Sequence, residues 1–115
     1  IVLDNFGWPA VGNMDAMLVP DGTDKSAVLT SLIAALRETL PKTTALSVSI
    51  EKNAPENSGL TPAVLALFDR IYADSETVDL AALTATLPAD FNAETRLVQL
   101  TQTPPATGSY VLITD

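Results

Sequence analysis

The sequence contains no cysteine and no histidine. Without thiols or imidazoles the chain forms no disulfides and offers neither the usual zinc ligands, a thiolate nucleophile nor a Ser-His-Asp triad. No apolar run approaches the roughly 18 residues that a membrane-spanning helix needs, so we expect no membrane insertion. Basic residues are scarce: six Lys and Arg stand against 14 Asp and Glu, which gives a formal net charge of −8. Because such a chain repels phosphate backbones, we expect no nucleic-acid partner.

The remaining composition is that of one folded domain. The chain has 115 residues, of which 47% are hydrophobic and 17% charged. That suffices for a single core and excludes a wholly disordered chain. Gly7, Pro9 and Gly12 interrupt any periodicity near the start. We therefore predict an irregular N-terminal arm over residues 1–13, with a short strand at 1–3, and a single compact domain over 14–115.

Strand and helix patterns alternate in the first half of that domain. The short apolar run 14–19, which ends at a Pro-Asp-Gly turn, predicts a strand. A helix over about residues 24–39 follows, because apolar residues recur there every four positions. The stripe that we expect to be buried consists of Val28, Leu32, Leu36 and Leu40, with Leu29 and Ile33 beside it. Strict alternation over 43–51 predicts a half-buried strand, paired in parallel with the first through the helical crossover.

The second half is predicted to hold two helices and two strands. Thr61-Pro62 is a typical helix start, and the expected buried stripe of that helix is Val64, Leu67, Phe68, Ile71 and Tyr72. Asp79 is positioned to cap a third, shorter helix over 80–87. Residues 95–102 and 109–114 are predicted strands, and the link between them contains Pro and Gly, so we expect an antiparallel hairpin with a long loop.

The order strand-helix-strand-helix-helix-strand-strand predicts a small single-domain α/β (or α+β) fold. We expect a mixed four-stranded sheet with two longer helices and one short helix, since each apolar face must find a second layer.

One loop is a candidate ligand site. It consists of Asp21, Gly22, Thr23, Asp24, Lys25 and Ser26. Ligands of open α/β sheets bind where the carboxyl end of a strand leads into a helix. Lys25 and Ser26 stand where a phosphate loop has its Lys-Ser pair, but Val19 and Asp24 occupy positions where that motif requires Gly. A turn with a helix N-cap is the alternative interpretation. We expect no metal and no cofactor.

Other segments are candidate partner contacts. The apolar residues of the arm must dock either on the core, which we favour, or on a partner, and the other segments are loops by composition. The candidate residues are Phe6 and Trp8 in the arm, Asn53, Pro55 and Asn57 in the loop 52–60, and Pro104 and Pro105 in the last loop. The edge strand of the C-terminal pair could also accept a partner strand.

These features favour a non-enzymatic protein-interaction or assembly module, a structural or adaptor component related to a virion or a secretion apparatus. The expected partner is another protein or a second copy of the chain. The alternative is a small-molecule or nucleotide-binding domain that uses the loop 21–26. A carboxylate-based hydrolase and an acidic mimic of nucleic acid are two further classes, but no nucleophile has an adjacent activator.

The compartment follows only indirectly from the sequence. The start without Met, the presence of only three Lys, and the abundance of Thr, Ala and Pro favour an extracytoplasmic or virion setting. A cleaved signal segment would account for such a start.

Overall fold

The computed structural model of this chain describes residues 1–4, 22, 24–51 and 59–113. Its strands form one sheet in which neighbours in the chain are neighbours in space, and every pair is parallel. They are β1 (Val2–Asp4), β2 (Ser47–Ile50), β3 (Arg70–Asp74), β4 (Leu97–Thr101) and β5 (Ser109–Leu112). The chain is therefore a small α/β domain, as predicted, but its described sheet is five-stranded and parallel rather than four-stranded and mixed.

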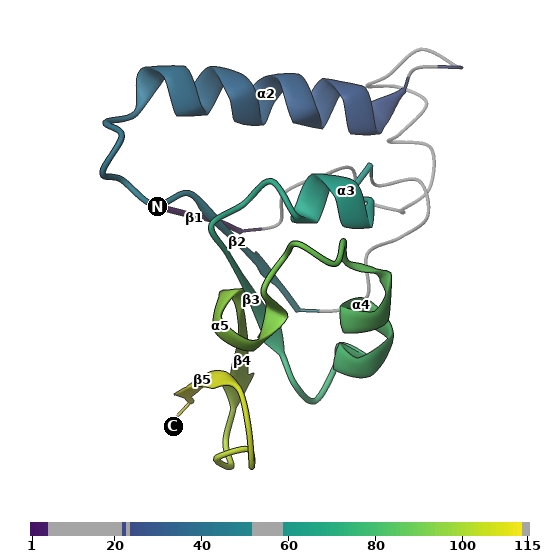
Figure 1. Ribbon diagram of the computed structural model, residues 1–115, viewed down its shortest axis with the longest axis vertical. Helices are drawn as coiled ribbons and strands as arrows, with labels where there is room; N and C mark the ends of the chain where they lie inside the picture. The colour runs from purple at the N-terminus through teal and green to yellow at the C-terminus, as the bar shows by residue number, and fades with distance from the viewer. Residues whose placement is uncertain (5–21, 23, 52–58, 114–115) are drawn as a thin grey trace.

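The helices of the described residues lie in the connections between the first four strands. They are α2 (Lys25–Thr39), α3 (Pro62–Leu65), α4 (Leu80–Thr86) and α5 (Ala93–Arg96). Parallel strands joined in sequence by crossovers of one hand place their helices on one face of the sheet. Figure 1 shows α2 and β5 at opposite ends of this arrangement.

The strand register explains which side chains meet the helices. Leu3, Val48, Ile71 and Leu97 lie at one level of the sheet and point to the same face. The last three are buried and belong to the core cluster, and Leu3 packs against it. The same cluster contains Leu29 and Ile33 of α2 and Val64 and Leu65 of α3, so this face is the helix-covered one.

Helix α2 matches its predicted bounds but buries only part of its predicted stripe. Asp24 caps it by accepting a hydrogen bond from the Ala27 amide, and the helix ends at Thr39 before Pro41. Leu29 and Ile33 are the buried residues, whereas Val28 and Leu32 are 44% and 45% exposed. The prediction is wrong for Val28 and Leu32, but Leu36 and Leu40 pack against the core as expected. All these residues recur with a period close to that of a helix, and only packing on the sheet selects among them.

The predicted second helix is largely a strand. Thr61 and Pro62 do start a helix, α3, but it ends at Leu65, and the chain continues as β3. Ile71 and Tyr72 therefore belong to the sheet. In β3 the buried residues Ile71 and Ala73 alternate with more exposed ones, which is the period of a strand. Val64, Phe68 and Ile71 are spaced by four and three residues, which is the period of a helix and explains the error.

The third helix is confirmed. Asp79 accepts a hydrogen bond from the Ala82 amide and caps α4, as predicted. The short helix α5 before β4 was not predicted, and Asn92 at its start makes no side-chain capping bond.

The last two strands exist, but their pairing was predicted wrongly. Strand β5 runs parallel to β4, with Val98 opposite Ser109 and Thr101 opposite Leu112. The link 102–108 returns the chain to the start of β4 although it is shorter than the dozen or more residues typical of parallel crossovers. Gly108 supports this return with a φ of 87°, which other residues rarely adopt. The predicted strand 14–19 lies outside the described residues.

Candidate functional site

The outer strand β5 presents an open edge. No strand of the described residues lies beyond it. Because the Ile113 amide donates to the Thr101 carbonyl, the backbone groups of odd-numbered residues face β4. Backbone direction alternates along a strand, so the N–H and C=O groups of Tyr110 and Leu112 face away from the sheet.

The side chains of this strand are apolar and exposed. Tyr110, Val111, Leu112 and Ile113 are each 41–47% exposed. Every earlier connection between described strands carries a helix, whereas the link 102–108 contains none. Tyr110 and Leu112 lie on the helix-covered side of the sheet by register, yet they stay exposed. Tyr110 and Leu112 stay uncovered because the link 102–108 is too short to contain a helix that would pack on them.

An apolar groove adjoins this strand on the same side of the sheet. It has a volume of about 540 Å³ and lies between α4, α5, β4 and the end of the loop 102–108. Leu80, Ala81 and Ala85 line one side of the groove, and Leu97 and Gly108 the other. Of the predicted contact residues, Pro104 is exposed and Pro105 partly exposed in the same loop.

Charge is absent from β4, β5 and the loop between them, although Glu94 lines the adjoining groove. Residues 97–114 contain no Asp, Glu, Lys or Arg, although the chain carries 20 charged side chains. Edge strands commonly carry charged side chains or proline that discourage pairing with other chains. Strand β5 contains neither. The edge is thus open to another strand in both its backbone and its side chains.

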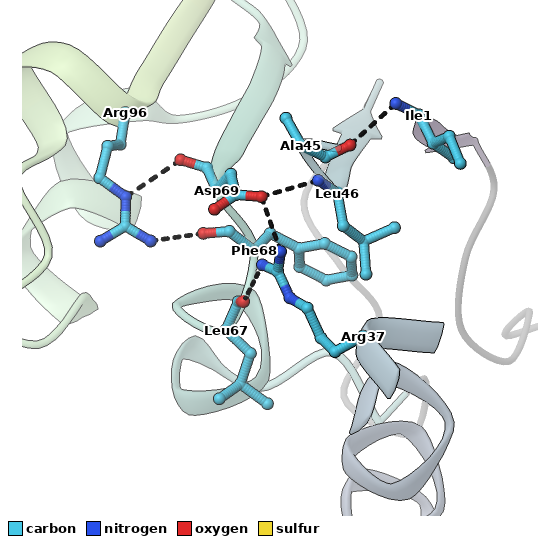
Figure 2. Close-up of polar contacts among 8 residues, drawn as sticks. All are labelled: Ile1, Arg37, Ala45, Leu46, Leu67, Phe68, Asp69 and Arg96. Carbon is cyan, nitrogen blue, oxygen red and sulfur yellow. Dashed lines mark hydrogen bonds and ion pairs between the residues drawn. The ribbon is translucent and has the colours of Figure 1, made fainter. Parts of the chain in front are cut away.

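The end of the sheet where the strands begin is polar and held by hydrogen bonds (Figure 2). Asp69 accepts hydrogen bonds at Oδ2 from the Leu46 amide (2.7 Å) and from Arg37 Nη1 (2.8 Å). The Asp69 amide donates to the Leu46 carbonyl (2.8 Å). Asp69 therefore ties the start of β2 to the start of β3 and both to α2.

Two arginines complete this network. Arg37 Nη2 donates to the Leu67 carbonyl (3.1 Å). Arg96 Nε donates to the Asp69 carbonyl (3.0 Å), Arg96 Nη2 donates to the Phe68 carbonyl, and the guanidinium lies 4.1 Å from the centre of the Phe91 ring. The hydrogen bond from Arg37 holds the pKa of the Asp69 carboxyl below its ordinary value, so Asp69 is ionised at neutral pH.

A hollow of about 450 Å³ opens at this rim. The basic residues that line it are Arg37, Lys42, Arg70 and Arg96, and Asp69 is the one carboxylate in the lining. Thr43, Thr44 and Thr95 contribute hydroxyl groups. Four of the six basic residues of an acidic chain thus gather at one place. This cluster was not predicted from the sequence because its members are far apart in the chain and match no motif.

The predicted ligand loop is described only in part. Asp21 and Thr23 lie outside the described residues, and Gly22 is exposed. Asp24 Oδ1 accepts hydrogen bonds from the Ser26 hydroxyl (2.7 Å) and the Ala27 amide (3.1 Å). These bonds hold the pKa of Asp24 below its ordinary value. They are the contacts of a helix N-cap, which was the alternative interpretation of this loop.

The remaining predicted contacts, Phe6, Trp8, Asn53, Pro55 and Asn57, also lie outside the described residues and stay predictions. Within the described part of the chain, no three Asp or Glu side chains converge as a metal site would require. No helix described there has the length and apolar character needed to cross a bilayer.

No protein family model, curated protein or solved structure matches this chain. Among the described residues, two places offer distinctive chemistry. One is the uncharged open edge at β5, and the other is the basic hollow where the strands begin.

Proposed function

We propose that this chain is a non-enzymatic assembly module that joins a second copy of itself edge to edge through β5. The observation that carries the proposal is the open edge. Tyr110 and Leu112 direct backbone donors and acceptors outward, and apolar side chains flank them on both faces of the strand.

Strand addition is the interaction that such an edge supports. An incoming strand forms main-chain hydrogen bonds with the edge, while its alternating side chains cover the exposed ones. Two copies related by a twofold axis would pair β5 with β5 antiparallel, so that the same residues supply both halves of the interface. The apolar groove beside α4 lies on the same side of the sheet as Tyr110 and extends the surface available for contact.

Charge favours β5 as the meeting point of two identical chains. Each copy carries a net charge of −8, so most surface pairings between copies bring carboxylates together. The segment 97–114 contributes no charge, and its contact surface escapes this repulsion. Raising the salt concentration screens the remaining long-range repulsion and should strengthen the association.

The other edge of the described sheet is less suited to this role. Strand β1 has only three residues, and one of them, Asp4, is exposed and accepts a hydrogen bond from the Ser49 hydroxyl. A carboxylate at the edge opposes pairing with a second copy. We therefore assign the interface to β5.

The test is sedimentation velocity over a range of protein concentrations with two matched proline variants. Leu112→Pro removes an N–H that faces outward from β5 and leaves the hydrogen bonds to β4 in place. Val2→Pro is the control, since the Ser47 amide donates to the Ile1 carbonyl and Val2 therefore faces the opposite open edge.

We expect a monomer–dimer equilibrium in the unmodified chain and in Val2→Pro, and a monomer in Leu112→Pro at every concentration. Thermal unfolding of each variant verifies that it is folded. An unmodified chain that stays monomeric at high concentration contradicts the proposal. The same holds for a dimer that Leu112→Pro leaves unchanged.

A further inference from the structure

We infer that the hollow where the strands begin is a binding site for a small phosphorylated ligand, independent of the assembly surface at β5. The hollow is positively charged. Four basic side chains and one carboxylate line the hollow, so the lining is positive in a chain whose net charge is −8. The chain has only two other basic residues.

A structural role accounts for two of the four cations. Arg37 and Arg96 donate to Asp69 and to backbone carbonyls at the start of β3. Each uses two of the five N–H donors of its guanidinium in these bonds. The network fixes both side chains in place, and the remaining donors are available to a ligand without further ordering of the side chain.

No such role accounts for Lys42 and Arg70. Both are exposed, and neither forms an ion pair or side-chain hydrogen bond with any other described residue. Lys42 follows the end of α2, and Arg70 begins β3, yet both line the same hollow. Clustered cations repel one another, and an anion held between them would offset that repulsion.

The donor set fits a phosphate group. Guanidinium groups bind phosphate oxygens in pairs, and an ammonium adds a point charge. Thr43 and Thr44 of the lining add hydroxyl donors, whereas the Thr95 hydroxyl already donates to the Asn92 carbonyl. A phosphate monoester carries about two negative charges near neutral pH, more than a single carboxylate does, and therefore gains more from several cations. Asp69 offsets the charge of one cation only, Arg37, with which it forms an ion pair, so the lining stays positive.

Size and overall charge limit the ligand to a small molecule. A volume of about 450 Å³ lies within the range of small-ligand pockets and exceeds what one phosphate group fills. A long polyanion such as a nucleic acid would extend beyond the hollow onto acidic surface and be repelled there. A monoester keeps its charge within the positive lining.

The experiment is a titration followed by amide chemical shifts in two-dimensional NMR, with inorganic phosphate and glycerol 3-phosphate as probes. Sodium chloride at matched ionic strength is the reference. We expect saturable shifts confined to residues 42–45, 69–70 and 95–96. Glycerol 3-phosphate should bind more tightly than inorganic phosphate where its organic part also contacts the hollow. Saturation by inorganic phosphate alone identifies the shared phosphate chemistry as sufficient.

Three single variants assign the site. Lys42→Gln and Arg70→Gln each remove a charge without removing a described hydrogen bond, and each should weaken binding about tenfold, which corresponds to one charge-assisted contact. Lys25→Gln lowers the net charge equally but lies at the start of α2, away from the hollow, and should leave the affinity unchanged. Shifts no larger than those caused by chloride, or equal weakening in all three variants, would overturn the inference.

Discussion

Strands β3 and β5 have similar apolar content, but β3 lies in the middle of the sheet and β5 at its edge. Strand β3 lies in the middle of the sheet between β2 and β4, and α3 and α4 occupy the connections on either side of it. Its Ile71 and Ala73 are fully buried. Strand β5 has three consecutive apolar residues, Tyr110, Val111 and Leu112, and all are exposed. The connection that precedes a strand, more than its own composition, decides whether its side chains are buried.

The two regions also differ in how their strands begin. The start of β3 is fixed by Asp69, which binds Arg37 and the Leu46 amide, and by Arg96, which binds two carbonyls. At the start of β5 the Ser109 hydroxyl donates to the Glu94 carbonyl (3.2 Å). A densely bonded central region and a sparsely bonded end should therefore respond differently to the same substitution.

The largest difference is expected from two glycine substitutions. At Gly59 φ is 83°, and an added Cβ would lie 2.9 Å from Lys25 Cβ and 3.0 Å from the backbone of α2. Gly59→Ala should cost about 2–4 kcal/mol of unfolding free energy, since backbone strain and overpacking add. Gly108→Ala, next to β5, meets only the flexible end of Gln99 at 3.4 Å and should cost about 1 kcal/mol. Urea unfolding measures both, and equal costs would contradict the distinction.

The second-largest difference in stability is expected from alanine substitutions at two valines, one buried and one exposed. Val48 in β2 is fully buried, whereas Val111 in β5 is 47% exposed. Val48→Ala should lower the unfolding free energy by about 2–3 kcal/mol, because buried methyl groups are lost and a cavity remains. Val111→Ala should change it by less than about 0.5 kcal/mol in the monomer. A comparable loss at both positions, measured by urea unfolding at low protein concentration, would show that β5 is covered after all.

The smallest effect concerns pH. The hydrogen bond from Arg37 lowers the pKa of Asp69 in the folded chain, so the unfolded chain binds the proton first as the pH falls. The resulting stabilisation is complete above the ordinary carboxyl pKa of about 4 and is lost as the pH falls through the lower folded value. Asp69→Asn removes it.

Because the Asp69 side chain is 41% exposed, the expected difference between the unmodified chain and Asp69→Asn is below about 1 kcal/mol at neutral pH. The difference should shrink toward zero in acid. Unfolding curves recorded from pH 7 to pH 3 measure it, and a difference that stays constant over this range would mean that the carboxylate charge contributes nothing.

Local signals in the sequence predicted much of the fold. The caps Asp24, Thr61 and Asp79 each start a helix where expected, and Pro41 follows the end of α2. The alternation of apolar and polar residues over 43–51 predicted the strand β2. These features depend on neighbouring residues only, so they can be read without knowledge of the tertiary structure.

What the sequence did not reveal depends on contacts between distant residues. Ile71 and Tyr72 were assigned to a helix because a short apolar run fits both periods, and pairing with β2 and β4 decides for a strand. The pairing direction of β5 and the convergence of Lys42 with Arg70 likewise arise only when the sheet is assembled. The edge strand was predicted as a surface that could accept a partner strand, although as part of a hairpin, and that role stays a prediction.

Amide hydrogen exchange at two adjacent residues, measured over a range of protein concentrations, tests assembly through β5 most directly. The Ile113 amide donates to the Thr101 carbonyl within one chain and should be protected at every concentration. The Leu112 amide faces outward and should exchange rapidly in dilute solution, then become protected as copies associate through β5. A Leu112 amide that exchanges equally fast at all concentrations would contradict assembly at this edge.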